Sequence, residues 1–248
     1  MSTTDAVSLV VPVRFAGPPG SANGGWLAGR LVELSSLRGL GRAVEVTLRH
    51  PPPLEVDLDV RTDDGLTTLG FGGAVIAEAR AAKLTGDPVE PVDLANAQAA
   101  MAGYAGGTGH PFPGCFVCGT DRPAPDGLGL RPGRLPGRPD TVATAWYPDA
   151  SVAEPDGTVP ARMVWAALDC PGGWSSDLVG RPMVLGRMTA AVDASPAVGD
   201  PYVVVGRHLR DDGRKTFTAT TAYDADGRVL GRAEAVWIAL RTSPPSMT

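Results

Sequence analysis

Two segments of the chain carry apolar residues at every third or fourth position and are therefore predicted helices: residues 23–37 and 159–171. Asn23 stands before two glycines, and an asparagine there suits a helix N-cap. The second segment has Pro160 in its first turn, where a proline is well tolerated. The Pro-Gly-Gly run that starts at Pro171 is expected to end this helix. Both segments are apolar nearly all round, which indicates helices buried against a sheet.

Strands are predicted wherever apolar and polar residues alternate, for example over 44–48 and 216–220. The turn signal Asp-Asp-Gly occurs at 63–65 and again at 211–213, each time between two strand-like runs. Upstream of each signal lie two further strand-like runs that are joined at a proline. The order of helix, two strands, turn and further strands therefore occurs twice, which indicates two copies of one α+β unit.

Each copy is expected to form an antiparallel sheet wrapped around one central helix, which is the hot-dog architecture. The predicted fold is therefore a double hot-dog, with two antiparallel sheets in tandem. The boundaries that follow are an N-terminal unit over 1–83, a linker over 84–112 and a C-terminal unit over 113–248. Within the linker, 92–104 is rich in helix-forming residues and predicts a helix that packs on the outside.

The composition is that of an ordinary globular protein, with 43% apolar and 20% charged residues among 248. A net charge of −5 argues against a general nucleic-acid binder, which needs a basic surface. The apolar run near the N-terminus is too short for a secretory signal or a membrane span. We therefore expect a cytoplasmic protein without a membrane span and without a nucleic-acid partner.

The central stretch 111-PFPGCFVCGTDRPAPDGLGLR-131 allows three interpretations. A zinc site would use His110, Cys115 and Cys118 and would need a fourth ligand; the chain's other cysteine is Cys170. A redox pair is disfavoured, because such pairs sit at helix N-termini and this one precedes turn residues. We favour the third interpretation, in which the cysteines are small apolar residues leading into a strand, and we predict no metal site.

Three stretches resemble known hot-dog thioesterases. The segment 115-CFVCGTDRPAPDGLGLR-131 is similar to the first-strand region of many single-domain hot-dog thioesterases. The stretches 15-FAGPPGSANGGWLAGRL-31 and 166-AALDCPGGW-174 resemble the two central helix regions of the double hot-dog acyl-CoA thioesterase II family. The resemblance covers about 10–82 and 113–240, and it implies hydrolysis of an acyl-CoA or acyl-carrier thioester to a free acid and a thiol.

Asp169 is the best candidate for activating the attacking water. It borders an apolar run that contains no other charge, so partial desolvation is expected to raise its pKa. The resemblance implies a hydroxyl partner at Thr189. It also implies a glutamine at a position where this chain has Glu234, which is a departure from the family.

Substrate-binding candidates lie mainly at the start of the first helix. Asn23, Gly24 and Gly25 would present backbone N–H groups to the thioester, although glycines there also permit close helix packing. Trp26 and Trp165 would line the acyl chain, although aromatic residues near a helix are often plain core. Coenzyme A enters as part of the substrate, and no other cofactor is expected.

Two alternatives stay open. The string 110-HPFPG-114 is similar to a dehydratase motif, but it precedes a strand-like run and neither helix contains a histidine. A non-catalytic protein that binds acyl-CoA or lipid is the second alternative, because Glu234 replaces an amide and a fold alone does not fix a function. Two fused units are equivalent to a dimer of single ones, so we expect a monomer or a homodimer.

Overall fold

The computed structural model describes residues 7–123 and 125–241. The helices are α1 (Gly24–Glu33), α2 (Leu94–Met101), α3 (Gly106–Gly109) and α4 (Ala161–Trp174). The strands are β1 (Val7–Val10), β2 (Val44–Leu48), β3 (Asp57–Asp63), β4 (Leu66–Phe71), β5 (Ala74–Ala81), β6 (Gly133–Leu135), β7 (Arg138–Trp146), β8 (Met183–Val192), β9 (Tyr202–Asp212), β10 (Lys215–Tyr223) and β11 (Val229–Ala239). No helix in these ranges is long and apolar enough to cross a membrane.

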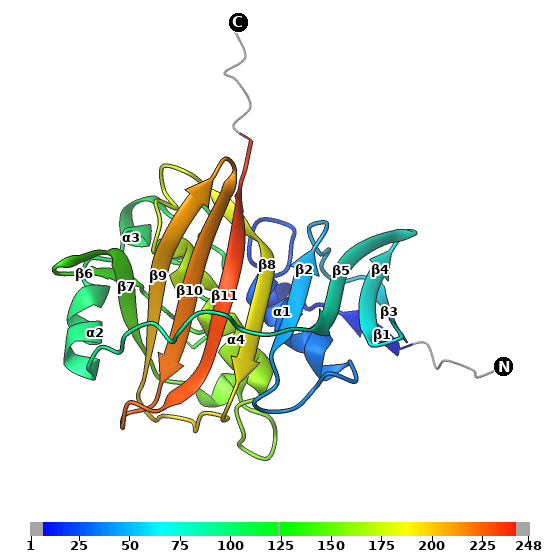
Figure 1. Cartoon of the computed structure of the whole chain (residues 1–248), viewed down its shortest axis with the longest axis horizontal. Coiled ribbons are helices and arrows are strands. Elements are labelled where there is room, and N and C mark those ends of the chain that lie inside the picture. The colour runs from blue at the N-terminus through cyan, green and yellow to red at the C-terminus, as the bar shows by residue number, and fades with distance from the viewer. Residues whose placement is uncertain (1–6, 124, 242–248) are drawn as a thin grey trace, which may run out of the picture.

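The strands form one continuous antiparallel sheet, in the order β1-β3-β4-β5-β2-β8-β11-β10-β9-β7-β6 (Figure 1). This corrects the prediction of two separate sheets. The join is the antiparallel pairing of β2 with β8, which runs from Val44 opposite Ala190 to Thr47 opposite Arg187. Joining the halves there leaves neither β2 nor β8 as an exposed edge, and unpaired edges favour aggregation.

The strand connections follow the same order on both sides of this join. After α1, strand β2 pairs with β5, β5 with β4, and β4 with β3. After α4, strand β8 pairs with β11, β11 with β10, and β10 with β9. Both predicted Asp-Asp-Gly turns are confirmed, and in the first of them Asp64 and Gly65 have φ of 44° and 75°. Such positive φ values match the tight turn between β3 and β4.

The helices α1 and α4 pack against each other and against one face of the sheet. Both predicted helices are confirmed, with Asn23 as the N-cap of α1 and Pro160 as that of α4. The predicted end of the second helix is wrong, because α4 continues through Pro171 to Trp174. Ser175 then caps it, with its hydroxyl donating to the Gly172 carbonyl at 2.6 Å.

The linker between the halves crosses the opposite face of the sheet, in front of β11, β10 and β9 (Figure 1). The Val89 N–H donates to the Thr221 hydroxyl at 2.9 Å, and the Tyr223 hydroxyl donates to the Val89 carbonyl. The linker then enters α2, which Asp93 caps and which packs on β6, β7 and β9. The predicted connector helix on the outside of the molecule is confirmed.

The segment 111–131 contains no strand among its described residues, which corrects the predicted lead-in. Residues 115–118 form a tight turn, in which the Gly119 N–H donates to the Cys115 carbonyl at 2.8 Å. The turn is held in the core, because the Phe116 N–H donates to the Ala16 carbonyl at 2.8 Å. The Gly-Leu-Gly-Leu run fails as a strand because Gly127 and Gly129 have φ of 106° and 65°.

Candidate functional site

The carboxylate of Asp169 lies at the N-terminus of α1, although Asp169 belongs to α4. Its Oδ2 accepts a hydrogen bond from the Gly25 backbone N–H at 3.0 Å. The same oxygen accepts a second bond from Asn23 Nδ2, also at 3.0 Å. Asn23 Oδ1 in turn accepts from the Trp26 N–H at 2.9 Å, so this one side chain caps α1 and holds Asp169. The positive end of the helix dipole favours a carboxylate at this position.

Asp169 is 2% exposed, and its second oxygen, Oδ1, has no hydrogen-bond partner in the protein. Burial raises the pKa of Asp169 to about 7, although donation from Gly25 and Asn23 acts in the opposite direction. An unpartnered buried carboxylate oxygen is costly, because such groups are almost always satisfied by protein or water. Oδ1 is therefore a buried acceptor whose partner the described residues do not supply.

The predicted substrate-binding residues cluster around this carboxylate, but most serve packing. A Cβ on Gly25 would lie 2.5 Å from Asp169 Cβ, so only glycine allows the two helices to approach. A Cβ on Gly24 would likewise lie 2.9 Å from Leu185 Cβ, so this glycine allows α1 to approach β8. Trp26 stacks on Phe15 at 4.0 Å between ring centroids. Both Trp26 and Trp165 are 3% exposed, and they belong to the main hydrophobic core.

Thr189 and Glu234 are not brought to Asp169. They lie opposite each other on β8 and β11, and on β11 the neighbours Ala233 and Ala235 are the residues buried toward the helices. Glu234 therefore points to the face that the linker crosses. There its Oε1 accepts hydrogen bonds from the Thr85 N–H at 2.8 Å and the Gly86 N–H at 2.6 Å. The predicted three-residue catalytic set is not assembled, because Glu234 anchors the linker.

Comparison with known proteins identifies the fold. No protein-family model and none of the curated protein sequences matches the chain. Solved structures do: a tesB protein of Mycobacterium avium subspecies paratuberculosis superposes with a TM-score of 0.63 at 11% identity, covering 95% of this chain and 93% of the other. An acyl-CoA thioesterase II of Mycobacterium marinum gives 0.61 at 11% identity, with 98% and 96% covered. A hot-dog protein of Alicyclobacillus acidocaldarius gives 0.60 at 13% identity, also with 98% and 96% covered.

The fold is the hot-dog fold of the thioesterase II proteins. The resemblance that the sequence indicated is thereby confirmed at the level of the fold, over nearly the whole chain. At 11–13% identity, the hot-dog fold alone is established, and the chemistry has to be argued from the site.

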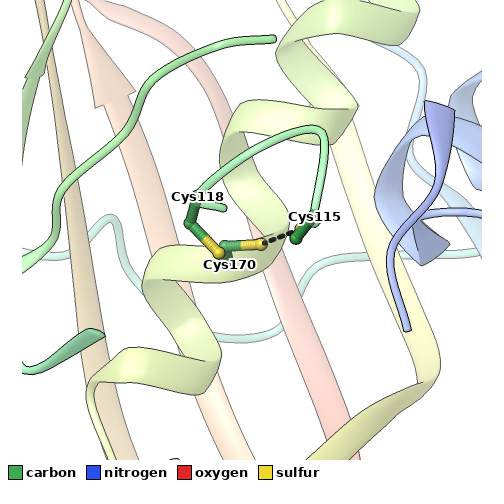
Figure 2. Close-up of side chains that lie close together, drawn as sticks. All are labelled: Cys115, Cys118 and Cys170. Atoms are coloured by element: carbon green, nitrogen blue, oxygen red, sulfur yellow. Dashed lines mark hydrogen bonds between the residues drawn. The ribbon is translucent and has the colours of Figure 1, made fainter. Parts of the chain in front are cut away.

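Beside the hot-dog helices lie the three cysteines, which the sequence led us to expect as small apolar residues without a metal. Cys115 and Cys118 lie on the turn over α4 and approach Cys170 of that helix (Figure 2). The three sulfurs all lie within 4.8 Å of one another, and all three thiols are buried and free. The Cys-x-x-Cys-Gly spacing was the available signal, but the third cysteine is 52 residues downstream of the second. Only the packing of the turn on α4 reveals the set.

Proposed function

We propose that this protein hydrolyses the thioester of an acyl-CoA, or of an acyl carrier, to a free acid and a thiol. The observation that carries the proposal is the position of Asp169: a buried carboxylate from one central helix faces the first turn of the other. One of its oxygens is held by Asn23 and Gly25, and the other has no protein partner. A fixed carboxylate beside the positive end of a helix can act as the general base of thioester hydrolysis.

In the proposed reaction, Asp169 takes a proton from a water molecule next to Oδ1 while the water oxygen bonds to the thioester carbon. The carbonyl oxygen gains negative charge, which the positive end of the α1 dipole stabilises. The carbon–sulfur bond then breaks, and the departing thiolate receives the proton from Asp169. Coenzyme A is part of the substrate in this scheme, and no metal or other cofactor takes part in it.

Asn23 has a positioning role in this scheme. Its side chain caps α1 through Oδ1 and orients Asp169 through Nδ2, so it fixes the carboxylate relative to the helix N-terminus. Thr189 and Glu234 take no part in this scheme. They are paired on β8 and β11, and both side chains lie on the face of the sheet that the linker crosses. The proposed site is therefore smaller than the set that the thioesterase resemblance implied.

A non-catalytic protein that binds acyl-CoA is the second candidate function. Two observations favour it: Asp169 is only 2% exposed, and neither Thr189 nor Glu234 reaches its carboxylate. In this case the protein would bind acyl-CoA without cleaving it, and Asp169 would only hold the start of α1.

The test is an assay of free-thiol release from short, medium, long and aromatic acyl-CoAs, with a blank that lacks substrate. Wild type is compared with Asp169→Asn and with Asp59→Asn, a matched change on an exposed position of β3. We expect Asp169→Asn to lower kcat at least about 100-fold, the scale of general-base catalysis. Asp59→Asn should retain full activity.

Two results would contradict the hydrolase mechanism. Equal turnover in wild type and a folded Asp169→Asn variant would remove Asp169 from the mechanism. Saturable binding of acyl-CoA by calorimetry, without turnover on any substrate, would establish the binding protein instead.

A further inference from the structure

We propose that Cys115, Cys118 and Cys170 together bind one zinc ion through three thiolates. This site lies beside the proposed hydrolase centre but does not depend on it, and its metal content can be measured whether or not the protein hydrolyses thioesters. The chemistry of the donor set favours zinc, because sulfur ligands select soft cations over magnesium or calcium.

The turn that carries the first two cysteines has the geometry of a metal-binding knuckle. The Gly119 N–H closes it by donating to the Cys115 carbonyl at 2.8 Å. A Cβ on Gly119 would lie only 2.3 Å from the Pro113 carbonyl oxygen, so the turn can be this tight only with glycine. The turn directs Cys115 and Cys118 to the same side, toward Cys170 on α4 (Figure 2).

The sulfurs of Cys115 and Cys170 have the spacing of two ligands of a tetrahedral zinc ion, and the sulfur of Cys118 lies close to both. A zinc–sulfur bond of about 2.3 Å places two sulfurs of a tetrahedron about 3.8 Å apart. The sulfurs of Cys115 and Cys170 are 3.7 Å apart, and all three lie within 4.8 Å of one another. The three sulfurs are therefore close to a zinc-binding arrangement.

Each sulfur also has a nitrogen donor nearby. Trp174 Nε1 and His110 Nε2 both lie 3.3 Å from the sulfur of Cys118. Asn23 Nδ2 lies 3.8 Å from the sulfur of Cys115 and 4.0 Å from that of Cys170. Donors of this kind stabilise thiolates and are common around metal-bound sulfur. Three adjacent buried thiolates would repel one another strongly, and a divalent cation among them removes that repulsion.

His110 is assigned to this outer set and not to the ligands. Its Nδ1 accepts a hydrogen bond from the Phe112 N–H at 2.8 Å, which leaves the ring hydrogen on Nε2. A protonated nitrogen can donate to the sulfur of Cys118 but cannot bind a metal. The protein thus supplies three ligands, and a solvent molecule completes the four of a tetrahedral ion.

The experiment measures zinc in the full chain, purified without a tag, kept reduced, loaded with zinc and passed into metal-free buffer. Mass spectrometry of the metal should give about one zinc per chain. Single serine variants of the three cysteines should each retain below about one tenth of that amount. His110→Ala should keep the zinc, as should His50→Ala, a matched change of an exposed histidine.

A second measurement on wild type does not depend on the variants folding. Titration with a mercurial reagent should release one zinc as the three thiols react. A chromogenic zinc indicator measures the released zinc. Substitution by cobalt should give thiolate-to-metal charge-transfer bands and intense tetrahedral d–d bands.

Wild type that is reduced at all three cysteines yet retains no zinc would overturn the site. Zinc retained by every folded cysteine variant would do the same, because it would be bound elsewhere. Loss of zinc in His110→Ala but not in His50→Ala would overturn the three-ligand assignment.

Discussion

The Asn23 side chain both caps α1 and holds the carboxylate of Asp169. Its Oδ1 satisfies a helix N–H that would otherwise have no partner, and its Nδ2 binds the carboxylate of Asp169. A side chain with both an acceptor and a donor is needed for this double role, and asparagine provides both. Serine can replace it as a cap but has no amide donor to extend toward Asp169.

We therefore predict that Asn23→Ser lowers kcat about tenfold or more, because Asp169 loses a donor that fixes its orientation. KM should change less than kcat. Loss of one partner from a buried carboxylate should also reduce the free energy of unfolding by about 1–3 kcal/mol. Steady-state kinetics and urea unfolding measure the two effects. Asn96→Ala on α2 is the control, because the Asn96 side chain donates to Asp93 at an exposed position. A folded Asn23→Ser enzyme with unchanged kcat would limit Asn23 to capping.

At the scale of single residues, the sequence singled out Asp169 and Asn23 as candidates, but it did not indicate where Glu234 points or that the three cysteines meet. Asp169 ends a charge-free run and Asn23 precedes a glycine pair, so local pattern was sufficient for both. The face to which Glu234 points depends on the strand register and on the path of the linker. Neither is encoded near residue 234. The cysteine cluster likewise depends on a contact between residues 52 positions apart.

The contact between α1 and α4 is the element that builds the candidate site. Two glycines one helical turn apart face α4: a Cβ on Gly25 would lie 2.7 Å from the Trp165 carbonyl oxygen, and one on Gly29 would lie 2.6 Å from Arg162 Cα. Residues four apart share one helix face, so these glycines form the contact surface of α1. At the far end of α1, Glu33 pairs with Arg162 at 3.1 Å.

Gly25→Ala should therefore push the two helices apart. Overpacking of this kind typically costs about 1–3 kcal/mol, which should appear as a lower urea midpoint with an unchanged slope. The matched control is Gly107→Ala, because a Cβ there meets nothing within 4 Å. A Gly25→Ala variant as stable as wild type would show that the helices can separate at no cost. Activity should also fall, since the Gly25 N–H and Asp169 would move apart.

Most elements were predictable because their signals are local. Helix periodicity, the caps at Asn23 and Pro160, and the Asp-Asp-Gly turns each depend on a few neighbouring residues. The end of α4 was not predictable in this way, since Pro171 normally stops a helix but here continues one. Burial of the last turn compensates, because 171–174 lie within the core. The stretch 115–131 was misassigned as a strand lead-in because its Gly-Leu-Gly-Leu run alternates, whereas Gly127 and Gly129 have positive φ values.

At the scale of the whole molecule, the two halves share one sheet and one pair of packed helices. The pairing of β2 with β8 joins two segments that are distant in sequence, and no local pattern specifies which edge strands meet. No local pattern specifies the path of the linker either. The linker contributes to a second, small apolar cluster that includes Val89, Ala97 and Val205. The two halves therefore contact each other through the β2–β8 pairing and the α1–α4 packing.

This continuity predicts that the chain unfolds in a single transition and not as separate units over 1–83 and 113–248. Separation would expose the α1–α4 contact and would leave β2 and β8 as unpaired apolar edges, so partly unfolded states should be unstable. Differential scanning calorimetry tests this through the ratio of the calorimetric to the van't Hoff enthalpy, which should be about one. The scan should be made on protein of constant metal content, because metal binding shifts stability by mass action. Two resolved transitions, or a ratio well above one, would instead identify the halves as independent folding units.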